Sequence, residues 1–415
     1  MQTLAEWLAW LEGLDPARIE LGLGRMRTVH ERLGPGPLAR ILVTVGGTNG
    51  KGSLVALFES VAQAAGLRVG AYTSPHIERY NERVRIDGRP VSDEALVEAF
   101  RQVEAARGKV PLTYFEFGTL AAFCCFAREP LDLALLEVGL GGRLDAVNVV
   151  DADCALLGQI ALDHLDWLGP DREAVGREKA GILRPGRPAI CADPRPPASV
   201  RAAADKGALL RVAGEDFRWQ VHGDGRWDWQ GMSAAWRALP SPGLAGRHQY
   251  GNAAAVLAAL EALGGRLPVP EAAIREGLAR ARLPGRFEIV AEAPQLVLDV
   301  AHNPAAAEAL AGVLGERPVA GRTLALYAAL EDKSVAGVVA ALQPRIDRWH
   351  LAGLDVPRGL SASALARRLP SGLDPVLHDR VSDALEAALA EAGPEDRVLV
   401  FGSFFTVAQA RAAAL

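Results

Sequence analysis

The sequence has few of the features that indicate a secreted or a membrane protein. Four cysteines occur among 415 residues and none forms a Cys-x-x-Cys pair, so we expect neither a zinc site nor a disulfide framework. No apolar run reaches the roughly 20 residues that a membrane span needs. The start, Met1 to Glu6, also lacks the basic residues of a signal peptide. We therefore expect a cytoplasmic protein with no membrane partner.

Aromatic residues and excess basic charge are scarce as well. Aromatics make up 6% of the chain and hydrophobic residues 50%, so its cores must consist mainly of alanine, leucine and valine. The 45 lysines and arginines are outnumbered by 50 aspartates and glutamates, and the net charge of −5 argues against a nucleic-acid partner. At 415 residues the chain exceeds the size of a single core, and two domains are expected.

The sequence does contain a glycine-rich loop around one lysine. The apolar run from Val43 breaks into Gly46-Gly47-Thr48-Asn49-Gly50-Lys51-Gly52-Ser53 and resumes over residues 54–58, which predicts a strand, a loop and a helix. Backbone N–H groups of such a loop can close around a phosphate, and the helix start adds the positive end of a dipole. The loop departs from the G-x-x-x-x-G-K-[ST] pattern because Gly52 follows Lys51. A turn that binds nothing is the alternative, but we expect a nucleotide triphosphate site.

Strands and helices alternate on both sides of this loop. One or two short helices are expected over residues 4–35, strands at 67–72, 131–138, 155–160 and 189–192, and helices from Ser53 to Gly66 and over 92–108, 113–128 and 171–183. Asp87-Gly88 is a hairpin turn signal. The alternation predicts a doubly wound α/β domain.

Residues 209–236 differ in character, with four tryptophans and a Gly-Asp-Gly turn. They predict short antiparallel strands. The tryptophans could form a base-stacking platform, but we favour a small β-subregion that packs on the sheet.

A second α/β alternation follows, with strands expected at 296–300, 324–329, 348–351 and 397–401. Helices are expected at 248–263 and 271–282 before it. We place the boundary near Gly285, which gives a nucleotide-binding domain over residues 1–285 and a smaller Rossmann-like α/β domain over residues 286–415.

Polar residues follow several of the expected strands. Ser74 comes after the second strand, Glu137 ends the run from Leu131, and His164 follows the strand at 155–160. Open α/β sheets bind ligands at the carboxyl ends of their strands, so these side chains could converge on the glycine-rich loop.

Together these segments resemble the folylpolyglutamate synthase and dihydrofolate synthase family, a branch of the Mur ligase superfamily. The glycine after the loop lysine is the form that this family uses. The matching stretches fall in order along most of the chain, at 47–53, 73–76, 81–83, 115–117, 137–145, 162–164, 177–181, 285–288 and 299–304.

The resemblance implies an ATP-dependent amide ligase that joins L-glutamate to dihydropteroate or to a reduced folate. In such enzymes the γ-phosphoryl group moves to a substrate carboxylate, and the glutamate amine attacks the acyl phosphate. Charge builds up on the transferring group, so magnesium and fixed cations are needed. Both synthase activities are expected, in a monomer, and a monovalent cation is a further candidate cofactor.

The resemblance also implies roles for residues of the first domain. Lys51 would hold the β- and γ-phosphates within the loop Gly47, Thr48, Asn49, Gly50 and Gly52, and Ser53 would bind the magnesium of the nucleotide. A second magnesium would be held by Ser74, Glu137 and His164. Taken singly, Glu137 fits a sheet-end ion pair and His164 a helix start or a core position; taken together, they favour the metal.

Lys179 matches a lysine that is carbamylated in this superfamily. A carbamate turns a cation into an anion that can help to hold a metal and orient substrate. The alternative is a surface lysine on a helix beside Arg177 and Glu178, and the sequence leaves both open.

Four further residues are implied near ATP. Arg286 would reach the phosphates, Asn252 would lie near the nucleotide, and Asp299 and His302 would contact ATP and organise the glutamate side of a cleft between the domains. Their ordinary alternatives are a linker ion pair for Arg286, a helix-start cap for Asn252 and a cap before Pro304 for His302. Domain closure is expected to complete the site.

Two rival functions share some of these features. A Mur-type ligase of cell-wall peptides would need an additional N-terminal domain, whereas only about forty residues precede the loop. A nucleotide-dependent switch would not require Glu137, His164 and Lys179 together.

Overall fold

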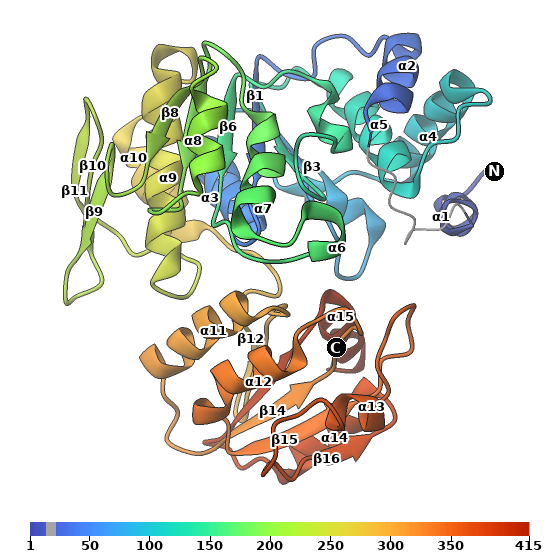
Figure 1. The fold of residues 1–415 in the computed structure, drawn as a ribbon, viewed down its shortest axis with the longest axis vertical. Coiled ribbons are helices and arrows are strands. Elements are labelled where there is room, and N and C mark those ends of the chain that lie inside the picture. Colours follow the sequence, from blue (N-terminus) through green and yellow to red (C-terminus); the bar gives the residue numbers. More distant parts are fainter. Residues whose placement is uncertain (14–21, 415) are drawn as a thin grey trace. The chain divides into compact units, whose positions relative to one another are not determined.

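The computed structural model describes residues 1–13 and 22–414 and divides into two compact units (Figure 1). The first comprises Met1–Gly243 and Tyr250–Arg282, and the second comprises Leu244–Gln249 and the chain from Leu283 onward. Across the described ranges, no helix has the length and apolar character that crossing a membrane requires.

The first unit is built on an eight-stranded sheet in the order β4-β3-β2-β5-β1-β6-β7-β8. The six strands from β2 to β8 in this order are parallel, and β3 and β4 form an antiparallel hairpin through Asp87 and Gly88. The strands are β1 Ile41–Gly46, β2 Val69–Tyr72, β3 Val84–Ile86, β4 Arg89–Pro90, β5 Leu133–Glu137, β6 Cys154–Leu157, β7 Pro188–Cys191 and β8 Leu209–Val212.

Most helices of this unit lie where they are predicted, whereas the short helices α6 and α8 were not predicted. Side-chain caps start several of them, as at Ser92, Thr113 and Asp171. The expected helices over 4–35 are α1 and α2, although residues 14–21 of that range lie outside the described residues. The helices are α1 Leu4–Glu12, α2 Gly24–Leu33, α3 Lys51–Ala64, α4 Asp93–Arg107, α5 Tyr114–Ala127, α6 Leu165–Leu168, α7 Arg172–Lys179, α8 Ala198–Ala204, α9 His248–Leu263 and α10 Glu271–Arg280. Short 3-10 helices are η1 Tyr80–Arg83, η2 Ala146–Val149, η3 Ala180–Ile182 and η4 Gly264–Arg266.

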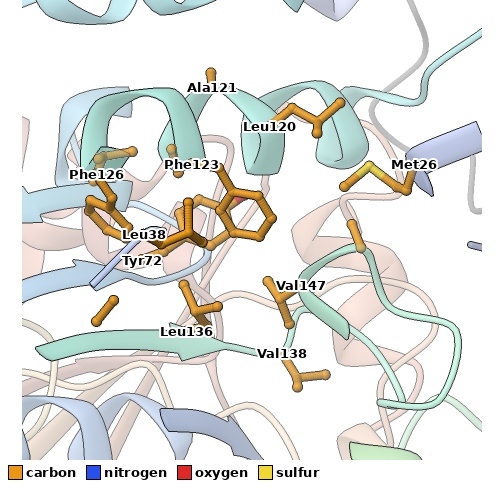
Figure 2. Packing of buried hydrophobic residues seen from close by; sticks show 14 of the residues in the cluster. Met26, Leu38, Tyr72, Leu120, Ala121, Phe123, Phe126, Leu136, Val138 and Val147 are labelled. Atoms are coloured by element: carbon orange, nitrogen blue, oxygen red, sulfur yellow. The ribbon is translucent and has the colours of Figure 1, made fainter. Parts of the chain in front are cut away.

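The core of the first unit packs helix α5 against the sheet. Every residue of α5 from Glu116 to Phe126 is buried, which explains why this helix is apolar on all sides. Figure 2 shows Phe123 and Phe126 of α5 next to Tyr72 of β2 and Leu136 of β5. This packing fixes the positions of β2 and β5, the two strands that lead into Ser74 and Glu137.

The tryptophan-rich segment corrects one prediction. Leu209–Val212 is not part of an antiparallel subregion but the parallel strand β8, because α8 provides a crossover from β7. The antiparallel part is a separate sheet, and it packs on helix α9 rather than on the main sheet: Trp229 is fully buried and its Nε1 donates to the carbonyl of Ala254 at 3.1 Å. Its strands are β9 Arg218–Val221, β10 Trp227–Gln230 and β11 Ala235–Leu239.

The second unit has its own six-stranded sheet in the order β12-β13-β17-β14-β15-β16. All neighbours are parallel except β12 and β13. The strands are β12 Glu288–Glu292, β13 Gln295–Leu298, β14 Thr323–Tyr327, β15 Arg348–Ala352, β16 Val376–His378 and β17 Arg397–Phe401. The helices are α11 Pro304–Glu316, α12 Val335–Leu342, α13 Ala362–Ala366, α14 Val381–Glu391 and α15 Phe404–Ala414, with the 3-10 helix η5 Gln343–Arg345. The predicted fold class, a doubly wound domain and a smaller α/β domain, is confirmed.

Candidate active site

The glycine-rich loop joins β1 to α3 and needs glycine at two positions. Gly47 and Gly50 have φ angles of +139° and +88°, which other residues rarely adopt. A Cβ atom on Gly47 would lie 3.0 Å from the backbone of Gly158, and one on Gly50 would lie 3.1 Å from Oδ1 of Asn252. The loop therefore contacts both the end of β6 and helix α9.

The loop is fastened to the segment that follows β6. The backbone N–H of Thr48 donates to the carbonyl of Gln159 at 2.7 Å, and its hydroxyl donates to the carbonyl of Ala161 at 2.9 Å. The same hydroxyl accepts the N–H of Ala161 at 3.1 Å. These bonds shape the loop through the protein itself.

The start of α3 is suited to an anion. Its N-cap residue, Gly50, supplies no capping side chain, and its first turn contains no acidic residue. Lys51 places its Nζ over the loop, donating to the carbonyls of Gly47 at 3.0 Å and Thr48 at 3.2 Å. Ser53 lies in the first turn of the helix and is buried. A helix start without a capping side chain, next to an ammonium group, fits the phosphates of a nucleotide.

Ser74 and Glu137 are brought together at the carboxyl edge of the sheet. Glu137 ends β5, the neighbour of β2, and its buried carboxylate accepts the backbone N–H of Ser74 at 3.2 Å. A carboxylate and a hydroxyl oxygen are ligands that magnesium prefers, with water and phosphate oxygens completing its octahedron. The side-chain oxygens of these two residues are therefore suited to magnesium, and His164, the third predicted ligand, would add a nitrogen.

His164 lies beyond β6, directly before α6. Its φ angle is +52° and its side chain is 38% exposed, so the core alternative is wrong and the side chain is accessible to a ligand. Since β2, β5, β1 and β6 are consecutive parallel strands, Ser74, Glu137, the loop and His164 all follow the same edge.

Lys179 is a buried lysine, and the surface alternative is wrong. The residue is 4% exposed and its Nζ donates to the carbonyl of Gly47 at 3.0 Å. Burial, and then the neighbouring charge of Lys51, lower the pKa of Lys179 to about 7. At a pH near 7, the Lys179 amine is thus uncharged in about half of the protein molecules.

Asp145 is a site residue that sequence reasoning missed, although it ends one of the matching stretches. Its buried carboxylate accepts the N–H groups of Leu140 at 2.8 Å and Val147 at 3.0 Å. Burial raises the pKa of Asp145 to about 6, against the lowering effect of those bonds and of Lys51. Its charge also acts on Lys179, so Asp145 is an acidic group that faces both lysines.

Asn252 lies inside α9, four residues after the helix begins at His248, so the alternative of a helix-start cap is wrong. The residue is buried, and its amide group lies against Gly50. Its predicted place near the nucleotide stays a prediction, which the position of its amide against the glycine-rich loop supports.

Three predicted residues of the second unit form a cluster. The carboxylate of Asp299 accepts the N–H groups of Phe287 and Ala301, both at 2.8 Å. Burial raises the pKa of Asp299, while the charges of Arg286 and His302 act in the opposite direction. The guanidinium of Arg286 lies 5.6 Å from the ring centroid of Phe404.

His302 does not cap α11. That position belongs to Asn303, whose side chain accepts the N–H of Ala306 at 2.9 Å. Instead, Nδ1 of the His302 ring lies 2.9 Å from the carbonyl oxygen of Val300. Arg286, Asp299 and His302 thus combine two basic side chains and a buried carboxylate beyond strand β13.

Comparison with known proteins gives consistent matches. Residues 285–404 match the family described as Mur ligase, glutamate ligase domain. Along the sequence, the chain is 48% identical over 406 residues to the dihydrofolate synthase/folylpolyglutamate synthase of Escherichia coli, covering 98% of this chain and 94% of that protein. The protein of the same name from Bacillus subtilis is 33% identical, with 97% of each chain covered.

Solved structures agree. E. coli FolC in complex with DHPP and ADP is similar with a TM-score of 0.94 and 47% identity, covering 99% of this chain and 97% of that one. A bifunctional folylpolyglutamate synthase/dihydrofolate synthase with Mn, AMPPNP and L-glutamate bound gives a TM-score of 0.92 at 46% identity, covering 99% of this chain and 98% of that one.

Proposed function

The chain belongs to the dihydrofolate synthase/folylpolyglutamate synthase family, and from this we propose that it is an ATP-dependent ligase that joins L-glutamate to dihydropteroate and to reduced folates, forming ADP and phosphate. One observation supports this most strongly. Lys51 of the phosphate loop and the buried Lys179 both donate to the carbonyl of Gly47. A buried lysine beside the loop is not needed to bind phosphate alone, and it supports a catalytic site at the loop.

The phosphates of ATP would lie at the start of α3, where Lys51 and the backbone N–H groups of the loop face them. Ser53 would hold one magnesium, and Ser74, Glu137 and His164 a second. When bound, magnesium supplies positive charge to the oxygens of the transferring group. The protein orients the acceptor carboxylate in line with the γ-phosphoryl group and keeps water out.

Two bond changes then make the amide. A carboxylate oxygen of the acceptor bonds to the γ-phosphorus while the bond to ADP breaks, which gives an acyl phosphate. The neutral amine of L-glutamate attacks its carbonyl carbon, and phosphate leaves from the tetrahedral intermediate while the amine loses its proton.

We propose further that Lys179 is carbamylated. A neutral amine and carbon dioxide give a carbamate and a proton, so the reaction needs an uncharged lysine, and the pKa of Lys179 near 7 supplies one. The resulting anion would lie beside Lys51, whose positive charge favours it. The carbamate would help to hold the second magnesium and to orient the substrate.

For the second unit we propose that Arg286 contacts ATP phosphates, and that Asp299 and His302 contact ATP and organise the glutamate. Asn252 would contact the nucleotide from the first unit, where its amide lies against Gly50. We also propose functional domains over residues 1–285 and 286–415, a monomeric state, a cytoplasmic location and a monovalent cation as an additional cofactor.

The test is ADP release with ATP, magnesium and L-glutamate, with dihydropteroate and tetrahydrofolate supplied in separate reactions. We expect turnover that requires glutamate together with either acceptor. ADP release that needs neither glutamate nor acceptor would favour the nucleotide-dependent switch and would overturn the ligase. Turnover with a uridine-nucleotide peptide acceptor alone would favour the cell-wall ligase.

A further inference from the structure

Arg83 is a buried arginine that no carboxylate of the described residues neutralises. It ends η1, directly before β3, and is 9% exposed. Its contacts are with uncharged rings: Nε donates to Nδ1 of His76 at 2.8 Å, and the guanidinium carbon lies 5.3 Å and 5.5 Å from the ring centroids of Tyr80 and Tyr114.

This environment attracts the guanidinium but leaves its charge uncompensated. Arginine is almost never fully buried unless it is paired, and a buried charge without a counterion is costly. Aromatic rings contribute a modest attraction. The guanidinium carries five N–H donors, of which the bond to His76 uses one. Because arginine can only donate, Nδ1 of His76 is the acceptor of this bond, and the ring supplies no negative charge to the guanidinium.

The charged side chains next to Arg83 in the sequence have partners of their own. Glu82 is adjacent in sequence, but its carboxylate accepts three backbone N–H groups, those of residues 77–79. Arg85, two residues further on, has a counterion: it lies 2.7 Å from the carboxylate of Glu59. Arg85 is therefore neutralised by a carboxylate, whereas Arg83 has no such partner among the described residues.

The position of Arg83 indicates which ligand. Its carbonyl accepts the N–H of Thr73 at 2.9 Å, which places it level with the end of β2 and next to Ser74, the residue bonded to Glu137. Strand β5 separates β2 from β1 and its phosphate loop. Two strand spacings amount to about 10 Å. An anion bound by Arg83 would therefore be distinct from nucleotide phosphates held at the loop and would belong to another substrate.

We propose that Arg83 binds a carboxylate of the acceptor substrate, with His76 as a positioning residue that holds the guanidinium in place. The inference rests on the proposed ligase function and adds a residue that recognises the acceptor. Two carboxylates have the required chemistry. One is the reacting carboxylate, which dihydropteroate and folates both carry, and the other is the α-carboxylate of the glutamyl group, which only folates carry.

The experiment measures KM for each acceptor, for ATP and for L-glutamate in the wild type and in Arg83→Met and Arg83→Lys. Arg89→Met, an exposed position on β4 of the same hairpin, is the matched control. A charge-assisted bidentate contact corresponds to about 10- to 100-fold in affinity. We expect Arg83→Met to raise KM for the acceptor by about that factor, Arg83→Lys to raise it less, and KM for ATP to stay within about twofold.

The acceptor series identifies the carboxylate. If Arg83→Met raises KM for both dihydropteroate and tetrahydrofolate, Arg83 binds the reacting carboxylate. If it raises KM for tetrahydrofolate alone, Arg83 binds the α-carboxylate. His76→Asn keeps a side-chain acceptor and should retain most of the acceptor affinity, whereas His76→Leu should lose it.

Unchanged KM for both acceptors in folded Arg83→Met, or a rise confined to ATP or glutamate, would overturn the inference. If that variant does not fold, Arg83→Lys decides by the same measurement. A wild type that is inactive with both acceptors contradicts the proposed function instead. Calorimetric titration of dihydropteroate and tetrahydrofolate into wild type and variant then still tests Arg83, because binding needs no turnover.

Discussion

Lys179 gives the sharpest prediction, because its pKa sets when carbon dioxide can react with it. With a pKa of about 7, about half of the Lys179 amines are neutral at pH 7, whereas an ordinary lysine with a pKa of 10.5 has fewer than about one in a thousand. We therefore expect a carbamate at neutral pH on Lys179 and not on exposed lysines. The neutral fraction should rise between about pH 6 and pH 8 and then level off.

The assay is carbon NMR of the protein in ¹³C-bicarbonate, together with ligase activity before and after removal of carbon dioxide. We expect one protected carbamate signal that Lys179→Met abolishes, and activity that falls when carbon dioxide is removed and returns when it is restored. Lys206→Met, at an exposed lysine of the same unit, is the control and should leave both unchanged. Full activity in Lys179→Ala without any dependence on carbon dioxide would refute the reasoning.

The same group affects stability in carbon-dioxide-free buffer. Folding lowers the pKa of this base, so the unfolded chain binds more protons between pH 7 and pH 10.5, and the free energy of unfolding rises with pH across that window. Below pH 7 the penalty of the buried ammonium is fully present. The pKa difference corresponds to about 5 kcal/mol as an upper limit, less about 1 kcal/mol for the bond to Gly47. Lys179→Met should therefore raise the Tm at pH 7 while it abolishes ligation; a lower Tm would contradict this.

Three further variants test other parts of the site. Lys51→Ala should lower ligation by about 1000-fold through lost phosphate contacts, with an unchanged circular dichroism spectrum; near-normal turnover would contradict the phosphate-loop assignment. Gly50→Ala should destabilise the protein by about 1–2 kcal/mol in urea unfolding, because of its φ of +88° and the contact with Asn252, and should weaken ATP binding. Arg286→Met should raise KM for ATP about tenfold or more with little change in Tm, and an unchanged KM would remove it from the nucleotide site.

The sequence predicted those parts of the fold in which burial is continuous. The strands β5 and β17 are buried along their whole length, β1 is buried at every residue except Leu42, and each of the three contains an apolar run of at least three residues. Strands β12 and β16 were not predicted, because each lies at a sheet edge and is partly exposed. The prediction for β8 was wrong because parallel pairing depends on the crossover through α8, which local composition does not reveal.

The site was predictable where motif and position coincide, as at Lys51 and Ser53. The state of Lys179 was not predictable, since a lysine between Glu178 and Ala180 on a helix shows neither its burial nor its bond to Gly47, 132 positions away. Asp145 was missed for the same reason: its charge matters through lysines that only the fold brings near. The roles of Arg286, Asp299 and His302 stay predictions, supported by their clustering within one unit.

The fastening of the phosphate loop to the segment after β6 bears on the thermodynamics of nucleotide binding. The hydrogen bonds of Thr48 to Gln159 and Ala161 do not involve a ligand, so they can order the loop before a nucleotide binds. Binding then costs little conformational entropy at the loop, and the affinity for phosphate reflects the contacts themselves. Replacing Thr48 by alanine removes the two hydroxyl bonds to Ala161 but keeps the backbone bond to Gln159, so part of the ordering would move to the binding step and appear in calorimetry as a more unfavourable binding entropy.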